Sequence, residues 1–199
     1  ANTDNNCVAQ DDGSIHTALF SLAAGTEPVD DGDTDANTNL SIDCGFVAPK
    51  PATVAVGDYI WVDANNDGKQ DADESALTGA VVTLLGKDGT AAKDADGNEV
   101  AAITTGADGK YLFSNLPAGE YSVTIKAPAG YVPTKGGAAV DTDESNTDSN
   151  CSAQADGSVE IALFNLVAGQ EPDTAVDGDD TNGNLTVDCG FYQPPEPTH

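Results

Sequence analysis

Residues 56–74 read VGDYIWVDANNDGKQDADE, and this stretch joins a strand-like segment directly to an acidic loop. Residues 57–62 have the character of a β-strand, and the alternation around Trp61 places its indole in a core rather than on a surface. No stretch of the chain shows a helical period. We therefore expect the loop to fix the end of a strand against its neighbours.

The loop itself, residues 63–74, matches the spacing of a calcium-binding loop. Oxygen ligands at these offsets surround a cation at about 2.4 Å, which suits calcium better than zinc. Gly68 stands where such a loop turns sharply, and Glu74 stands where a carboxylate binds through both oxygens. A solvated acidic turn is the alternative. The predicted calcium ligands are Asp63, Asn65, Asp67, the carbonyl of Lys69, Asp71 and Glu74.

A repeat determines the layout of the chain, because residues 1–47 and 145–192 are two copies of one segment. Cys7 aligns with Cys151 and Cys44 with Cys189, so the repeat is about 145 residues long. Residues 1–47 therefore lack the front of their own domain. The predicted layout is the C-terminal half of a preceding repeat at 1–47, a Pro-containing linker at 48–55, a complete repeat at 56–192, and a Pro-rich linker or tail at 193–199.

The complete repeat reads as short strands separated by turns. Apolar and polar residues alternate from Tyr121 to Lys126 and from Leu185 to Phe191, whereas Val81–Leu85 is apolar on both faces, as in a central strand. Asp108-Gly109 and Asp156-Gly157 mark turns. This pattern predicts an all-β chain folded as a β-sandwich.

Four cysteines without a Cys-x-x-Cys pair indicate disulfides and an oxidising compartment. Cys189 lies on the apolar face of its expected strand, and Cys44 does likewise beside Leu40, Ile42 and Phe46. No basic neighbour supports a catalytic thiol at either pair. We predict the pairs Cys7–Cys44 and Cys151–Cys189, each worth about 4 kcal/mol on the chain-entropy account.

The amino-acid composition excludes several classes of function. The chain has 34 acidic residues against 7 Lys and no Arg, which gives a formal net charge of −27. Such a negatively charged surface repels nucleic acid and anionic membranes. The sequence contains no apolar run long enough to span a membrane, so we expect no membrane insertion. The complete repeat contains neither His nor Arg, so a Ser/His/Asp arrangement or an arginine clamp cannot form within it. We therefore expect no enzymatic activity.

Further acidic clusters offer weaker candidates for calcium, because no ligand spacing defines them and a solvated loop is an equal alternative for each. Asp94, Asp96 and Asn98 instead predict an ordinary turn. The second-ranked predicted ligands are Asp141, Asp143 and Asp148 in one cluster, and Asp177, Asp179 and Asn182 in another.

Three strings together resemble a known family: residues 56–74, GADGKYLFSNLPAGEYSVTIKAPAGY at 106–131, and VDCGFY at 187–192. They are similar to the B domains of serine-aspartate repeat surface proteins, within the collagen-adhesin B-type (Cna-B-like) family of bacterial stalk modules. The resemblance implies a transthyretin-like or immunoglobulin-like β-sandwich in a tandem array with several calcium ions, including one at residues 63–74. It also implies an extracellular, cell-surface or secreted spacer in contact with neighbouring repeats. The cysteines and the long repeat depart from the family's familiar pattern.

Two alternatives to a rigid stalk stay open. A carbohydrate- or protein-binding adhesive module would use exposed aromatic residues such as Trp61, Tyr59 or Tyr131. A self-assembling filament subunit would use residues 1–47, whose strands lack their natural partners, through β-strand addition. Exposed aromatic residues would favour the adhesive module, and buried ones the spacer.

Overall fold

A computed structural model of the chain describes residues 6–48, 50–140, 147–155, 158–173 and 175–195. The chain divides into two compact units, unit 1 at Ala1–Lys50 and unit 2 at Pro51–His199. The described residues form strands, turns and irregular segments without an α-helix, and hence contain no helix able to cross a membrane. The chain is therefore all-β, as predicted.

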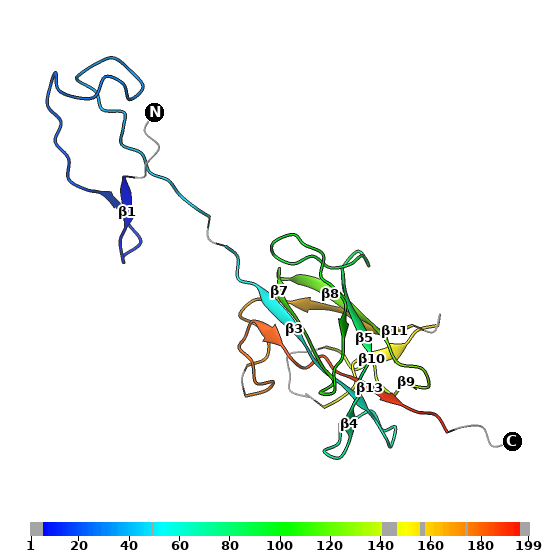
Figure 1. The fold of residues 1–199 in the computed structure, drawn as a ribbon. Helices are drawn as coiled ribbons and strands as arrows, with labels where there is room; N and C mark the ends of the chain where they lie inside the picture. The colour runs from blue at the N-terminus through cyan, green and yellow to red at the C-terminus, as the bar shows by residue number, and fades with distance from the viewer. Residues whose placement is uncertain (1–5, 49, 141–146, 156–157, 174, 196–199) are drawn as a thin grey trace. The chain divides into compact units, whose positions relative to one another are not determined.

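Unit 2 consists of two sheets (Figure 1). One has the order β10-β11-β8-β5-β6, and the other has the order β12-β3-β13-β9 with β4 and β7 also paired to β3. The strands are β3 Val54–Val62, β4 Ser75–Ala76, β5 Val81–Gly86, β6 Ile103–Thr104, β7 Lys110–Leu116, β8 Gly119–Lys126, β9 Val132–Pro133, β10 Cys151–Ala153, β11 Val159–Leu166, β12 Gly183–Asn184 and β13 Cys189–Tyr192.

The core of unit 2 is filled by apolar side chains from both sheets, as in a β-sandwich. In β8, Tyr121, Val123 and Ile125 are buried as expected, but Ser122, which was expected on the opposite, polar face, is buried as well. In β5, Val82 and Leu84 are buried while Val81, Thr83 and Leu85 are half-buried, so burial alternates along this strand, which was expected to be apolar on both faces. Burial on this scale supplies the main stabilising free energy of the unit.

Strand β3 is the hub of its sheet because it pairs with four other strands. It runs parallel to β12 and β13 and antiparallel to β4 and β7. The paired strands β3 and β7 are so close at Gly57 that a Cβ atom on this residue would lie 2.2 Å from the carbonyl oxygen of Tyr111. Any larger residue there would force the two strands apart.

The last predicted strand differs from the observed one. The chain is in strand conformation at β12 and β13, but residues 185–188 between them are not. Thr186, Asp188 and Gly190 were expected on a solvent face, yet all three are buried. The reason is that β13 lies between β3 and β9, while Ser149 and Asn150 cover it through hydrogen bonds to Gly190 and Asp188.

Unit 1 contains one small antiparallel sheet of β1 Cys7–Ala9 and β2 Ile15–Thr17. The strand expected around Cys44 does not form, and Leu40, Ile42 and Phe46 are exposed. A strand requires a ladder of backbone hydrogen bonds to a neighbouring strand, and in the described part of unit 1 the main-chain bond between Asn6 and Asp43 is not continued into such a ladder. Both predicted disulfides are present, Cys7–Cys44 in unit 1 and Cys151–Cys189 in unit 2.

Candidate metal centre

The acidic loop of residues 63–74 begins where β3 ends and is closed at its base by a short hairpin. Trp61 and Val62 of β3 pair with Ala76 and Ser75 of β4, so the two ends of the loop are held together. The side chain of Trp61 is fully buried, which confirms its expected place in the core. Residues 57–62 lie within β3, so the loop follows a strand as predicted.

Asp63 is the anchor of the loop and is fully buried. Its carboxylate accepts hydrogen bonds from the main-chain N–H groups of Gly68 at 2.8 Å and Asp67 at 3.2 Å, and from the hydroxyl of Thr134. Burial raises the pKa of Asp63, but the hydrogen bonds from Thr134, Gly68 and Asp67 outweigh it and hold this pKa below its ordinary value. Asp63 is therefore ionised at neutral pH.

The remaining oxygen-bearing side chains fold the loop through short-range bonds. The Glu74 carboxylate accepts from the N–H of Ala64 at 2.7 Å and of Asp71 at 3.1 Å, so it spans the loop from end to end. The Asn65 amide donates to the carboxylates of Asp67 at 3.3 Å and Asp71 at 3.0 Å. The carboxylates of Asp67 and Asp71 thus both accept hydrogen bonds from the same amide group of Asn65.

Three segments distant in sequence meet the loop. The N–H of Asp63 donates to the carbonyl of Phe191 in β13 at 2.8 Å, and the N–H of Gln70 donates to the carbonyl of Thr147 at 2.6 Å. Thr134, next to β9, reaches Asp63 by its hydroxyl. Gly68 has a positive φ of 85°, and a Cβ atom there would lie 2.3 Å from the carbonyl oxygen of Lys135. The loop is therefore a junction between the ends of several strands.

The donor chemistry of this loop fits a hard divalent cation, since every predicted side-chain ligand presents oxygen. Nevertheless, no three acidic, His or Cys side chains within the described ranges are gathered closely enough to hold a metal ion. Lys69, predicted to bind through its carbonyl, pairs through its main chain with Asp148. The loop thus has the residues and the turn of a calcium site, and its carboxylates are held by N–H donors.

The second-ranked candidates fall in different places. Asp141 and Asp143 lie outside the described residues. Asp148 lies beside the loop through its pairing with Lys69, whereas Asp177 accepts from the N–H groups of Asp179 at 3.0 Å and Leu185 at 2.9 Å. The side-chain oxygen of Asn182 accepts from the N–H of Gly169 at 3.1 Å. These bonds organise local turns, as do those that Asp94 accepts from Asp96 and Asn98.

Asp188 is a functional candidate that the sequence did not reveal. It is fully buried, accepts the N–H of Tyr59 at 3.0 Å, and lies near Asp58, whose carboxylate is 3.5 Å from the ammonium group of Lys110. Burial first, and then the charge of Asp58, raises the pKa of Asp188 well above its ordinary range. Alternation placed Asp188 on a solvent face, so the repeated string DCGF was the only available signal.

Most aromatic residues of unit 2 are buried, whereas Phe20 and Phe46 of unit 1 are exposed. Trp61 and Tyr111 are buried, and the Tyr111 hydroxyl donates to the carbonyl of Val187 at 2.7 Å. Tyr131 is half-buried and lines a shallow groove together with Val81, Thr124 and Val159. Of the three aromatic residues named in the sequence analysis, only Trp61 is buried, while Tyr59 and Tyr131 are half-buried, so burial alone does not decide between a spacer and an adhesive module.

Comparison with known proteins places this architecture in a family. A profile described as the SdrD B-like domain matches residues 54–187. Serine-aspartate repeat-containing protein F of Staphylococcus epidermidis is 36% identical over 158 residues, which cover 79% of this chain and 7% of that protein. Serine-aspartate repeat-containing protein D of Staphylococcus aureus strain Newman is also 36% identical over 158 residues, covering 79% of this chain and 9% of that protein.

Among solved structures, the minor pilin GBS52 of Streptococcus agalactiae has 16% sequence identity and a TM-score of 0.38, over 74% of this chain and 47% of that one. This structural match is too distant to support an argument. The chain spans under a tenth of the length of the two staphylococcal relatives, at 7% and 9%. The profile match covers well over half of the chain and extends from β3 almost to β13. The chain belongs to the SdrD B-like domain family.

Proposed function

We propose that this chain is a non-enzymatic, calcium-binding structural module that serves as a rigid stalk or spacer in a bacterial cell-surface or secreted protein. Family membership supports a structural role, and the two disulfides support an oxidising, extracellular location. The proposed partners are calcium ions and neighbouring repeats of the same protein. The observation with the greatest weight is that one acidic loop joins β3 to segments around Thr134, Thr147 and Phe191.

The proposed mechanism is mechanical. Asp63 is ionised and buried, and it lies in the same loop as several other carboxylates of a chain whose formal net charge is −27. A calcium ion in this loop would neutralise these carboxylates and hold the junction closed, so that the strand ends resist bending. Asp63, Asn65, Asp67, Asp71, Glu74 and the carbonyl of Lys69 would hold the ion.

Thermal unfolding with calcium and with a chelator, disulfides intact, tests this proposal. Calcium at a hundredfold excess over its dissociation constant should add about 2.7 kcal/mol for one site. For a unit of this size, this corresponds to roughly 5–10 °C in the unfolding midpoint. The gain should shrink as pH falls, because protons compete for the carboxylates.

A matched pair of variants locates the site. Glu74→Gln should remove most of the calcium-dependent gain, since Glu74 spans the loop. Asp94→Asn should keep the full gain, since Asp94 forms an acidic turn of similar hydrogen bonding with no proposed ion. An unchanged midpoint on chelation, or an equal loss in both variants, would contradict the calcium site.

A further inference from the structure

Each unit contains one copy of the repeated segment, here called the back segment. The structure describes it at residues 6–47 in unit 1 and at residues 147–155, 158–173 and 175–192 in unit 2. The two back segments share their local hydrogen bonds. Asn6 and Asn150 each exchange main-chain and side-chain bonds with Asp43 and Asp188, respectively. Glu27 accepts from the N–H of Ala23 at 2.7 Å, and Glu171 from that of Val167 at 2.6 Å. The hairpins have the same register, Cys7 opposite Thr17 and Cys151 opposite Ile161. Unit 1 is thus folded locally like the back of a complete repeat.

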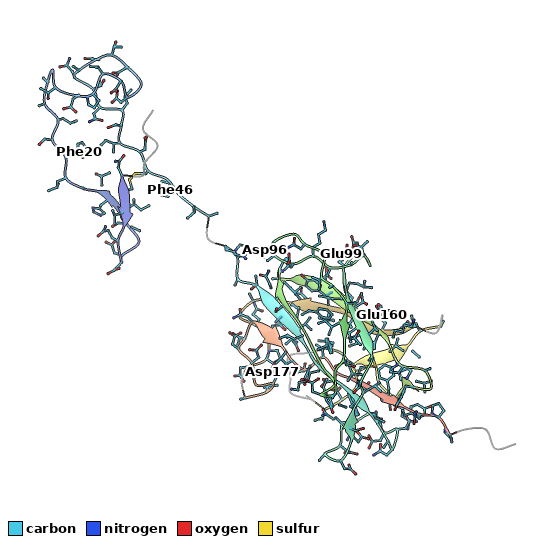
Figure 2. All side chains as sticks on the ribbon, viewed as in Figure 1. Phe20, Phe46, Asp96, Glu99, Glu160 and Asp177 are labelled. Atoms are coloured by element: carbon cyan, nitrogen blue, oxygen red, sulfur yellow. A yellow bond between two sulfur atoms is a disulfide. The ribbon has the colours of Figure 1, made fainter. Side chains whose placement is uncertain are left out.

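The two back segments differ sharply in the exposure of equivalent apolar side chains. Aligned by the repeat, Phe20 corresponds to Phe164, Leu22 to Leu166, Ile42 to Val187 and Phe46 to Phe191. The exposed fractions are 54%, 64%, 38% and 75% in unit 1, against 7%, 0%, 0% and 0% in unit 2. Figure 2 shows Phe20 and Phe46 on the ribbon of unit 1. Unit 1 therefore leaves uncovered the apolar side chains whose counterparts unit 2 buries, and this set is here called the apolar face of unit 1.

Unit 2 shows what covers that face. Its back segment rests on β8, with Phe164 opposite Tyr121, and on β3, with Phe191 opposite Val62. Both strands belong to residues 54–126, here called the front segment. Correspondingly, unit 1 lacks strands where its back segment would pair with a front segment: β2 stops at Thr17, and residues 37–46 form none. The strand pairing that unit 1 retains is the β1–β2 hairpin, because both of its strands belong to the back segment.

We propose that the apolar face of unit 1 is a docking surface for a second front segment, meaning a polypeptide with the chemistry of residues 54–126 supplied by sequence outside unit 2. It would dock by strand addition, with its counterpart of Tyr121 opposite Phe20 and its counterpart of Val62 opposite Phe46. The side chains that would become buried match those in unit 2 in polarity at almost every position. Thr17, in place of Ile161, is the exception.

The proposal does not depend on calcium, and the full chain serves to test it. Nitrogen-15-labelled chain of residues 1–199 would be titrated with an unlabelled polypeptide of residues 51–140 as the probe. Amide resonances of unit 1, including those of Phe20, Leu22, Ile42 and Phe46, should move and saturate at one equivalent of probe. Resonances of unit 2 should stay in place, since its own front segment occupies the equivalent face.

Two variants make the test specific to the apolar face. Leu22→Asp should abolish the shifts, because Leu22 corresponds to the fully buried Leu166. Leu19→Asp should preserve them, because its counterpart Leu163 is exposed even in the complete unit. Each of three results would overturn the proposal: absence of shifts in unit 1, shifts that survive Leu22→Asp, or movement of unit 2 resonances. If unit 1 resonances shift when the chain alone is concentrated, the occupant is a second copy of the chain and this proposal is wrong.

Discussion

The back segments of units 1 and 2 form a natural comparison, because nearly the same sequence occurs with and without a front segment beside it. In both, the disulfide, the hairpin and the bonds of the acidic turn are present. Only in unit 2 does the second strand of the hairpin extend to eight residues, Val159–Leu166. Turns and local hydrogen bonds thus follow from neighbouring residues, whereas strand length and burial follow from distant ones.

The comparison also shows that one acidic position of the repeat, occupied by Glu27 in unit 1 and by Glu171 in unit 2, has a different role in each unit. Glu27 and Glu171 receive the same bonds, from a main-chain N–H and from Asn39 or Asn184. Glu171 is buried, whereas Glu27 is half-exposed. A buried carboxylate depends on these donors far more than one in contact with water. The same contacts therefore organise a turn in unit 1 and satisfy a buried charge in unit 2.

The largest expected effect concerns the disulfides. Replacing Cys151 and Cys189 by Ala should destabilise unit 2 by about 4 kcal/mol, because this pair restricts the unfolded chain of a cooperative unit. Replacing Cys7 and Cys44 should leave the unfolding of unit 2 unchanged. Denaturant unfolding followed by Trp61, the only tryptophan of the chain, reports on unit 2 alone. Equal losses for the two pairs would show that the units unfold together.

A smaller effect is expected from the apolar face. Leu166→Ala should cost unit 2 about 3 kcal/mol, as is usual for a fully buried leucine. Leu22→Ala, the equivalent change in unit 1, should alter stability by less than about 0.5 kcal/mol, because this side chain is exposed. Denaturant unfolding followed by Trp61 measures the effect of Leu166→Ala on unit 2, and hydrogen exchange of the unit 1 amides measures the effect of Leu22→Ala on unit 1. A loss above about 1 kcal/mol for Leu22→Ala would mean that Leu22 is covered in solution.

The same contrast explains what the sequence can and cannot predict. The end of β3 at Val62, the loop after it and the disulfide pairs were predictable, because each depends on alternation, fixed spacing or the repeat. The strand around Cys44 was wrongly expected, because alternation describes a face but does not supply a pairing partner. Burial of Asp188 was missed for a related reason: segments remote in sequence cover it. The hydrogen bond from the Thr134 hydroxyl to Asp63 likewise depends on a tertiary contact.

The smallest expected effect distinguishes the two aspartates that precede the second cysteine of each copy. Asp188 is fully buried, and Asp43 is exposed. Because burial raises the pKa of Asp188, its contribution to stability is complete below about pH 4 and is lost as pH rises through the folded-state pKa. Asp63, whose pKa is lowered, acts in the opposite sense and loses its contribution as pH falls.

The difference between wild type and Asp188→Asn isolates the first of these contributions, because Asp63 is the same in both proteins. An asparagine keeps an oxygen for the N–H of Tyr59 but cannot ionise beside Asp58 and Asp148. The variant should therefore gain stability relative to wild type as pH rises from 4 to 8, on the order of 1 kcal/mol or roughly 2–4 °C in midpoint. Asp43→Asn should show no such trend in unit 2. A relative gain toward acid pH would instead mean that Asp188 is stabilised as an anion, and this prediction would be wrong.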